Sequence, residues 1–269
     1  MVKLSEVNLE DSETMDRGYI GEIFNSIQGE GLYTGKRQVF IRFSGCNLNC
    51  VYCDSREFRD LRPARCRIEL SPGSGKFRYK KNPMRSVDVL HHVKRLVTPS
   101  THSVSLTGGE PLMAGDFLVE VASACRRAGL TTYLETNGTN SKMIEKVAEY
   151  VSIAAIDIKL PDHQAISRSN WHDLFMEELR CIELAVKSGV ETFVKMVILP
   201  STRAESIARV SRQLAKFEVP VVLQPVTPAY KIRNAPKIKH VYQLAEVACR
   251  SGVKEISIIP QLHKLIGVH

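Results

Sequence analysis

The chain has 269 residues, 43% of them hydrophobic and 25% charged, which suits one sizeable buried core and excludes a disordered chain, a collagen-like repeat and a disulfide-stapled miniprotein. No run approaches the roughly 18 apolar residues that a membrane helix needs, and the start lacks the apolar segment of a signal peptide, so we expect a cytoplasmic protein. The formal net charge of +8 comes almost entirely from residues 56–85, which carry ten basic and three acidic side chains, a balance of +7. The rest of the chain is nearly neutral, which excludes a protein built to coat nucleic acid.

The first part of the chain predicts a polar tail followed by strands. Residues 1–19 are mostly polar, whereas residues 19–27 and 37–45 are rich in aromatic and β-branched side chains. We expect two extended segments there, at the start of a single domain that covers residues 1–269, because the sequence contains no internal repeat.

Three of the seven cysteines lie close together directly after the second extended segment. Cys46, Cys50 and Cys53 have the spacing C-x3-C-x2-C, which indicates a metal or cluster site kept reduced rather than a disulfide framework. Three thiolates in a short loop can hold three irons of a cubane 4Fe-4S cluster and leave the fourth iron open to a substrate or cosubstrate. A structural zinc site is the alternative. Such a site usually takes four protein ligands, and Cys66 is the candidate for the fourth.

Residues 56–85 predict an inserted loop, because this basic stretch contains three prolines and two glycines. The loop has two interpretations. It could dock an acidic electron donor of flavodoxin or ferredoxin type, or it could simply be solvated. The second interpretation is favoured, since runs of charge usually face solvent.

From residue 86 onward, helical and apolar segments alternate. Helices are predicted at 86–97 with Ser86 as N-cap, 116–129, 141–150, 173–187, 204–217 and 239–252, and strands at 101–109, 131–138, 151–160, 191–200, 219–226 and 254–260. Strands of Val, Ile and Leu joined by crossover helices predict an α/β fold with a parallel sheet. Polar residues and glycines at the carboxyl ends of six or seven strands favour a partial (β/α)6-type barrel over a doubly wound sheet.

The cysteine loop, with Tyr52 before the last cysteine, resembles the signature of the radical S-adenosylmethionine (SAM) superfamily. TGGEP at residues 107–111 resembles the second motif of that superfamily, although a lone GGE could be only a turn. The resemblance implies a 4Fe-4S cluster on the three cysteines and SAM on its open iron. It implies SAM contacts for Tyr52, Gly108, Gly109, Glu110, Glu135, Asn137, Asp157 and Lys159.

Within that superfamily the chain resembles the 7-carboxy-7-deazaguanine synthases. The resemblance rests on EIFNSIQGEG at 22–31, VFIRFSGC around Arg42, ETNGT at 135–139, LQPV at 223–226 and the terminal PQLHKLIGVH. It implies substrate contacts for Ile27, Gln28, Gly29, Glu30, Arg42, Thr107, Gln224, Pro225 and His269. Gly29 could instead shape a turn, and Arg42 could be paired on a strand edge. A carboxylate and a guanidinium beside apolar strand residues are costly without a ligand, which favours binding.

Two residues depart from the family pattern. Ser55 stands where the family usually has the threonine that binds magnesium, and its hydroxyl keeps the hard oxygen that Mg2+ prefers. Asp157 stands where many members have a serine, two residues before Lys159. Asp157 could accept a hydrogen bond from the ribose of SAM, or it could only pair with Lys159. The terminal carboxylate of His269 would reach the substrate by resemblance, whereas the alternative is a frayed tail.

The resemblance implies the following reaction. A radical made from SAM removes a hydrogen atom from C6 of 6-carboxy-5,6,7,8-tetrahydropterin, the ring contracts and ammonia leaves. The product is 7-carboxy-7-deazaguanine, a precursor of queuosine and archaeosine. Mg2+ at Ser55 would hold the substrate carboxylate. A homodimer and a flavodoxin or ferredoxin donor are also implied, without membrane or nucleic-acid partners.

Two rival functions remain open at this point. One is another radical SAM enzyme, such as an activating enzyme for a glycyl-radical protein, against which SIQGEG, LQPV and PQLHK argue. The other is a cluster or zinc module for electron transfer or nucleic-acid binding. The remaining cysteines, Cys125, Cys181 and Cys249, lie at apolar positions of predicted helices, so we expect them in the core.

Overall fold

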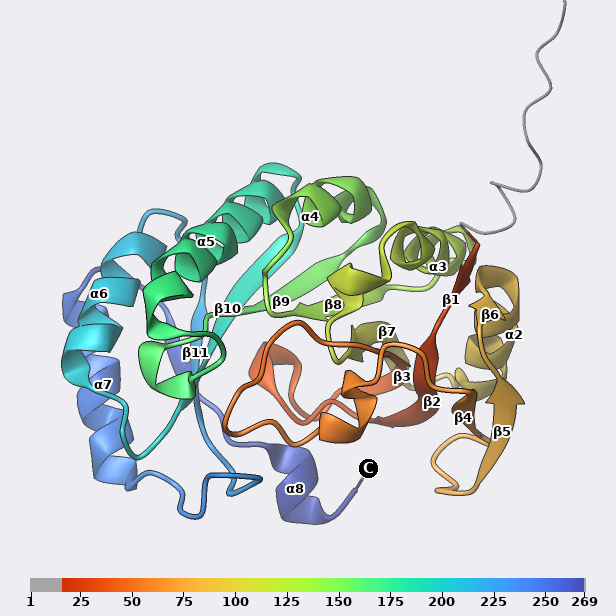
Figure 1. The fold of residues 1–269 in the computed structure, drawn as a ribbon, viewed down its shortest axis with the longest axis horizontal. Coiled ribbons are helices and arrows are strands. Elements are labelled where there is room, and N and C mark those ends of the chain that lie inside the picture. The colour runs from red at the N-terminus through yellow and green to blue at the C-terminus, as the bar shows by residue number, and fades with distance from the viewer. Residues whose placement is uncertain (1–15, 269) are drawn as a thin grey trace, which may run out of the picture.

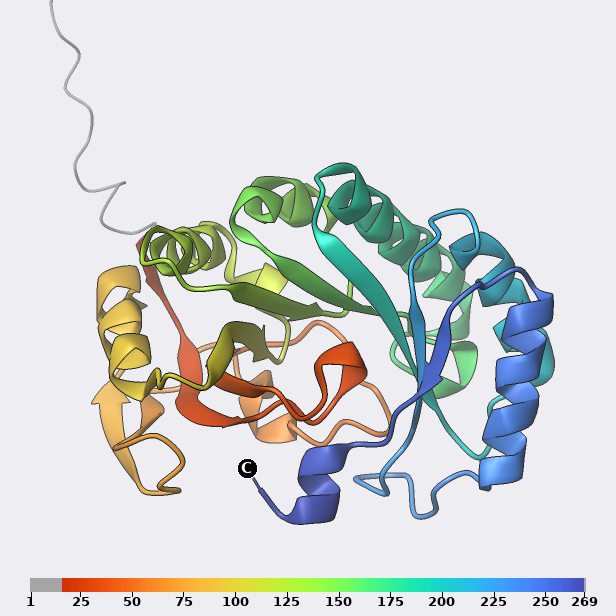
Figure 2. The same cartoon turned by 180° about the vertical axis from the view of Figure 1, so that it is seen from behind.

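The structure, a computed structural model, describes residues 16–268, so residues 1–15 and His269 lie outside the described part. A ten-stranded sheet curves through these residues, with helices along its outer side (Figures 1 and 2). In sheet order its strands are β12 (Ile256–Ile258), β11 (Val221–Pro225), β10 (Glu191–Ile198), β9 (Ile153–Asp157), β8 (Thr132–Thr136), β7 (Thr101–Gly108), β3 (Arg37–Phe43), β2 (Ile20–Ile27), β4 (Arg65–Glu69) and β5 (Phe77–Lys81).

The helices follow the predicted alternation. They are α2 (Ser86–Leu96), α3 (Asp116–Arg127), α4 (Ser141–Val147), α5 (Trp171–Lys187), α6 (Ala204–Leu214), α7 (Ile238–Arg250) and α8 (Leu262–Ile266). Short 3-10 helices are η1 (Gly31–Tyr33), η2 (Arg56–Arg59), η3 (Pro111–Ala114), η4 (Ala148–Tyr150), η5 (Pro161–His163) and η6 (Arg168–Asn170). No helix in the described part is long and apolar enough to cross a membrane.

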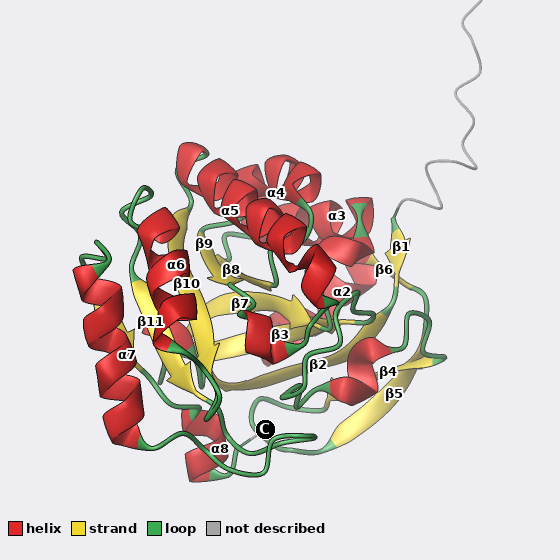
Figure 3. Cartoon of the chain, turned by 60° about the vertical axis from the view of Figure 1, so that its left-hand side comes forward, coloured by secondary structure: helices red, strands yellow, loops and turns green. Residues whose placement is uncertain are grey.

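Neighbouring strands run parallel throughout the part of the sheet made by β12, β11, β10, β9, β8, β7 and β3, which confirms the predicted α/β fold. Within residues 16–268 the sheet has β12 and β5 as its two edges, so it is an open, partial barrel. Helices α2 to α7 cover its outer side, whereas α8 lies on the open side (Figures 1 and 3). The carboxyl ends of the parallel strands therefore meet on one rim, next to the cysteine loop and α8.

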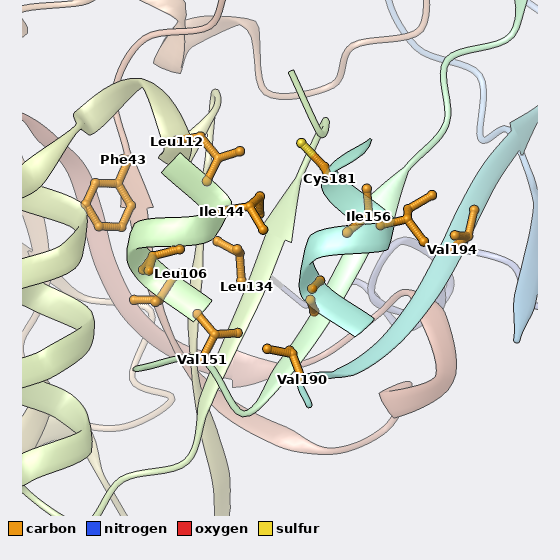
Figure 4. Packing of buried hydrophobic residues seen from close by; sticks show 14 of the residues in the cluster. Phe43, Leu106, Leu112, Leu134, Ile144, Val151, Ile156, Cys181, Val190 and Val194 are labelled. Atoms are coloured by element: carbon orange, nitrogen blue, oxygen red, sulfur yellow. The ribbon is translucent and has the colours of Figure 1, made fainter. Parts of the chain in front are cut away.

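The core lies between the parallel strands and the crossover helices. Figure 4 shows Leu106, Leu134 and Ile156, from three neighbouring strands, packed with Ile144 of α4 and Cys181 of α5, and all five are at most 2% exposed. Burying each large aliphatic side chain contributes about 1.5–3 kcal/mol, so this layer fixes the strands beneath the site.

The three helix cysteines do not all lie in this core. Cys125 and Cys181 are buried as predicted, but Cys249 is exposed near the end of α7, so that prediction is wrong. The apolar pattern of a short helix does not determine whether a residue at the edge of its apolar face is buried.

The insertion is the main correction to the predicted fold. Residues 56–85 form strands rather than a loop: β4 pairs in parallel with β2, β5 pairs with β4 as a hairpin, and the sheet gains two strands. The reason is alternation, because Cys66 and Ile68 point into the core while the neighbouring Arg65 is exposed. The many charged residues of this segment concealed the alternation of buried and exposed side chains that is typical of a strand.

The predicted N-terminal boundaries also need correction. Arg17–Gly18 (β1), placed in the tail by the sequence, pairs with β6 (Met84–Arg85). Ser86 is the first residue of α2 rather than its N-cap, and its backbone N–H donates to Asp16 Oδ1 at 3.2 Å. Because Asp16 supplies the acceptor, the helix start no longer needs the serine side chain as a cap.

Candidate functional site

Two adjoining cavities, of about 180 and 220 Å3, open on the rim of strand ends. The first is lined by every residue predicted to hold the cluster, Mg2+ or SAM, namely Cys46, Cys50, Cys53, Ser55, Tyr52, Gly108, Gly109, Glu110, Glu135, Asn137, Asp157 and Lys159, together with Gln224. The second is lined by Ile27, Gln28 and Gly29. Both share Glu30, Arg42, Asp54, Ser55, Thr107 and Glu135, so they form one continuous site.

Two of the predicted contacts are not found among the residues that line the cavities. Pro225 follows Gln224 on β11 but lines neither cavity. His269 lies outside the described residues, although Val268, next to it, lines the second cavity.

The cysteine loop brings three free thiols to one wall of the first cavity. Cys46, Cys50 and Cys53 pack with Leu48 and Leu174 in a small apolar cluster. Burial raises the pKa of the Cys46 and Cys50 thiols. Among the described residues, no three His, Cys, Asp or Glu side chains converge on a single-ion position.

Cys66, the candidate fourth ligand of the zinc alternative, lies apart from this loop. Its side chain is fully buried in the main hydrophobic core and lines neither cavity. Burial raises the pKa of the Cys66 thiol, with a smaller contribution from the nearby Glu22 carboxylate. A site built on the loop cysteines therefore has three thiolates from this chain.

The TGGEP loop lies directly against the cysteine loop. Gly109 N–H donates to Phe43 O at 3.0 Å, and Glu110 N–H donates to Gly45 O at 2.7 Å. A Cβ on Gly109 would lie 2.1 Å from Gly45 O, so only glycine allows the two backbones to approach this closely.

Glu110 is buried beneath that loop and is held by three donors. Its carboxylate accepts from Leu112 N–H at 2.9 Å, Thr136 Oγ1 at 2.6 Å and Asn137 N–H at 2.7 Å. Burial nevertheless raises the pKa of Glu110 to about 7. The residue thus joins the ends of β7 and β8 at the wall of the first cavity.

A chain of buried ion pairs crosses the floor of the site. Lys159 Nζ lies 2.8 Å from Asp157 Oδ2, and Lys195 Nζ lies 3.4 Å from Asp157 Oδ1 and also pairs with Glu30. Burial lowers the pKa of each lysine, but the carboxylates outweigh it and both pKa values lie above the ordinary one. Lys195 similarly outweighs burial and keeps the pKa of Glu30 below its usual value.

Sequence reasoning missed Lys195, although its two partners, Glu30 and Asp157, were predicted site residues. The signal was a lysine at the centre of the apolar strand 191–198, where alternation places it on a buried face that tolerates a charge only when it is paired. Gln261 was missed too; its Nε2 donates to Glu30 Oε1 at 2.6 Å and to Asp54 Oδ2 at 3.2 Å. These bonds tie the C-terminal segment to the cysteine loop.

The second cavity gathers the QGEG segment and the end of β8. Gln28 Nε2 donates to Glu135 Oε1 at 2.5 Å, and Thr107 Oγ1 donates to Glu135 Oε2 at 2.9 Å. Burial raises the pKa of Glu135. A Cβ on Gly29 would lie 1.8 Å from His263 Nδ1, so the glycine lets α8 close over this wall.

Glu178, a buried residue next to Lys159, allows a test of how burial of a carboxyl group affects stability. Its Oε1 accepts from Lys159 N–H at 3.0 Å, its Oε2 has no hydrogen-bond partner among the described residues, and burial raises its pKa well above the usual value despite the nearby Lys159 ammonium. The folded protein therefore holds this proton, and the stability that Glu178 contributes is lost as the pH rises toward the raised pKa.

Glu178→Gln is accordingly expected to leave stability unchanged at about pH 5 and to increase it progressively toward about pH 8, because the amide has no proton to lose. Urea unfolding of wild type and variant across this range measures the difference. A loss of stability that is the same at every pH would contradict the prediction.

The chain is similar to known proteins over most of its length. The family model for the radical SAM superfamily matches residues 40–214. The 7-carboxy-7-deazaguanine synthase of Methanothermobacter thermautotrophicus is 33% identical and covers 94% of this chain and 98% of its own; that of Methanocaldococcus jannaschii is 35% identical, with 93% and 99% covered. The enzyme of Geobacter sulfurreducens is 38% identical, with 91% and 96% covered.

Solved structures share the fold. QueE from Escherichia coli superposes with a TM-score of 0.58 at 18% identity, over 94% of this chain and 99% of that one. A radical SAM methyltransferase from Sphaerobacter thermophilus gives a TM-score of 0.60 at 12% identity, over 89% and 77%. Since the superfamily model spans more than half of the chain and the relatives match it almost end to end, the chain belongs to the radical SAM superfamily and, within it, to the 7-carboxy-7-deazaguanine synthase family.

Proposed function

We propose that this chain converts 6-carboxy-5,6,7,8-tetrahydropterin to 7-carboxy-7-deazaguanine with loss of ammonia, as a radical SAM lyase. The observation that carries the proposal is the continuity of the two cavities. One contains the three loop cysteines, the other contains the QGEG segment, and they meet at Glu30, Arg42 and Thr107. A cosubstrate in the first cavity and a substrate in the second would therefore have their reacting atoms side by side.

The residues of the first cavity fit the cluster and SAM that the superfamily implies. Cys46, Cys50 and Cys53 would hold the cluster, since their thiols are free, share one wall and lie in apolar surroundings. When bound, the cluster and SAM supply a carbon radical that removes a hydrogen atom from the substrate. The chain's own task is to position the ligands and to exclude water.

Residues around SAM would bind it through fixed polar groups. Asp157 is held between the ammonium groups of Lys159 and Lys195, and these two ion pairs fix the orientation of its carboxylate. It can therefore serve both interpretations made from the sequence, as the partner of Lys159 and as an acceptor for a ribose hydroxyl. Gln224 adds a buried Oε1 without a hydrogen-bond partner in the described part.

The second cavity offers the acceptors and the cation that a carboxypterin needs. The amino group and ring N–H groups of a pterin are donors, and the carboxylate of Glu30, kept charged by Lys195, is a suitable acceptor. Arg42 supplies a cation for the substrate carboxylate. Gln28 and Thr107 hold Glu135 beside them, so the floor is ordered before substrate binds.

We also propose Mg2+ at Ser55, whose hydroxyl borders both cavities. The Ser55 hydroxyl would hold a magnesium ion there, because Mg2+ prefers hard oxygen ligands, and the ion would supply positive charge for the substrate carboxylate. Turnover stimulated by Mg2+ in wild type and Ser55→Thr, but not in Ser55→Ala, would support this role. Equal stimulation of Ser55→Ala would exclude it.

We propose as well that the terminal carboxylate of His269 contacts the substrate. Unchanged turnover after a C-terminal extension would count against this contact.

The remaining proposals concern partners. An acidic flavodoxin or ferredoxin would dock on the exposed basic residues of β5, Lys80 and Lys81. Neutralising these two should weaken reduction by a protein donor at low salt and leave dithionite-driven turnover unchanged. We further propose that the protein is a cytoplasmic homodimer, which a molar mass from light scattering would test. Its product would supply queuosine or archaeosine synthesis.

The decisive experiment is turnover of the proposed substrate. Anaerobically reconstituted, dithionite-reduced protein should form 7-carboxy-7-deazaguanine from SAM and the carboxytetrahydropterin, detected by mass spectrometry. Omitting SAM is the control and should give no product. If reduced protein cleaves SAM in the presence of the pterin without forming any deazaguanine, the proposed substrate is wrong.

A further inference from the structure

Three charged side chains from three neighbouring strands meet beside the second cavity. Glu22 lies on β2, directly opposite Arg42 on β3 and directly opposite Arg67 on β4. Arg42 Nε lies 2.8 Å from Glu22 Oε1, and Arg67 Nε lies 3.0 Å from Glu22 Oε2. The Glu22 side chain is fully buried, and its carboxylate is shared between two guanidinium groups.

The insertion also contacts Arg42 directly, through Phe58 near the start of the insertion. The guanidinium carbon of Arg42 lies 5.0 Å from the ring centroid of Phe58 in η2 and 5.6 Å from that of Phe24, so two aromatic rings flank it. Phe58 reaches this position across Gly21, where a Cβ would lie 2.3 Å from the phenyl ring.

Only some of these side chains face the second cavity. Arg42, Glu22 and Phe58 line the second cavity, whereas Arg67 does not. Arg67 is stacked instead on Phe77 of β5, with its guanidinium carbon 4.7 Å from the ring centroid. Arg67 therefore acts on the cavity through Glu22.

We propose that the insertion 56–85 is a wall of the substrate site, in which Arg67 is a positioning residue that holds Glu22 so that Arg42 can bind an anionic group of the substrate. The inference rests on the proposed function, which places the substrate carboxylate at Arg42. One carboxylate cannot neutralise two guanidinium groups. If Arg67 is removed, Glu22 Oε2 loses this hydrogen-bond donor and the carboxylate can turn further toward Arg42, which draws the Arg42 guanidinium away from the substrate anion and weakens their attraction.

The test compares variants of two arginines from the same strand. Arg67→Met removes the partner of Glu22, Arg67→Lys keeps the charge without the planar fork, and Arg65→Met makes the same change at an exposed position two residues away. With dithionite as reductant, we expect Arg67→Met to raise KM for the carboxytetrahydropterin by about tenfold or more, with kcat within about twofold of the wild-type value. Arg67→Lys should show a smaller rise in KM. Arg65→Met should have the same KM and kcat as wild type.

Two further measurements separate positioning from general damage. Binding of tetrahydropterin without the carboxylate, measured as competitive inhibition, should be nearly equal in wild type and Arg67→Met, because the lost interaction is with the anion. Phe58→Leu, in the other half of the insertion, should also raise KM for the carboxylated substrate, by a smaller factor.

Several outcomes would overturn the inference. They are an unchanged KM in Arg67→Met, a fall in kcat without a change in KM, and equal losses of affinity for the carboxylated and uncarboxylated pterins. Failure of the proposed function looks different, because wild type itself would then form no deazaguanine. In that case, SAM cleavage and cluster content would be equal in all the variants.

Discussion

Replacing Cys50 by serine is expected to abolish cluster binding and to lower deazaguanine formation by more than about 1000-fold. Cys50 is the most buried of the three loop cysteines, and its thiol lies in an apolar cluster with Leu48 and Leu174. A serine oxygen is a poor ligand for a cluster iron, and two thiolates leave two irons without protein ligands. Iron and sulfide content after anaerobic reconstitution, the ultraviolet-visible spectrum and turnover would all be measured.

Cys66→Ala is the matched control, because Cys66 was the fourth-ligand candidate of the zinc alternative. Its side chain lies in the core and lines neither cavity, so the substitution should cost about 1–2 kcal/mol of stability and leave iron content and turnover unchanged. A loss of cluster in Cys66→Ala, or a full cluster in Cys50→Ser, would contradict the assignment of three loop thiolates and one open iron.

The parallel sheet and its crossover helices were readable from sequence because each depends on a local period. A strand buried on both faces is a short run of Val, Ile and Leu, as in Val221, Val222 and Leu223 of β11, and a crossover helix has its own apolar stripe. The β4–β5 hairpin was missed for a physical reason. Its inward positions, such as Cys66 and Ile68, alternate with arginines, so the average composition is that of a loop although the alternation is that of a strand.

The site divides in the same way. The cysteine loop and TGGEP were found because their chemistry depends on residue type at fixed spacing, and the close approach of Gly109 to the Gly45 backbone shows why the spacing is strict. Lys195 was missed because its meaning depends on a partner, Glu30, that lies 165 positions away. Glu22 and Arg67 share this property, since only the strand order places them opposite one another.

Lys195→Met is expected to reduce kcat/KM at neutral pH by about 100-fold or more and to destabilise the protein by about 3–5 kcal/mol, because a buried ion pair loses one partner. Lys195 pairs with both Glu30 and Asp157, and the side chains of Lys195 and Glu30 are 10% and 20% exposed. Without the ammonium group, burial is the main remaining influence on Glu30, and it raises the pKa of that carboxyl.

The sign of the pH dependence follows from that change. In wild type the pKa of Glu30 is lowered, so the ion pair stabilises the protein above the usual carboxyl pKa and is lost only as the pH falls through the lowered value. In Lys195→Met the pKa of the Glu30 carboxyl is raised by burial, so turnover should rise as the pH increases through that raised pKa. Lys195→Arg should keep the wild-type profile because it keeps the cation.

Lys254→Met provides the comparison for removing a lysine from an ion pair at the surface. Lys254 pairs with Glu218, and the two side chains are 73% and 66% exposed, so this substitution should change neither stability nor turnover measurably. The pH profile of kcat/KM is the discriminating measurement, because simple destabilisation lowers activity at every pH. A Lys195→Met profile parallel to that of wild type would show that Lys195 does not keep Glu30 ionised for substrate binding.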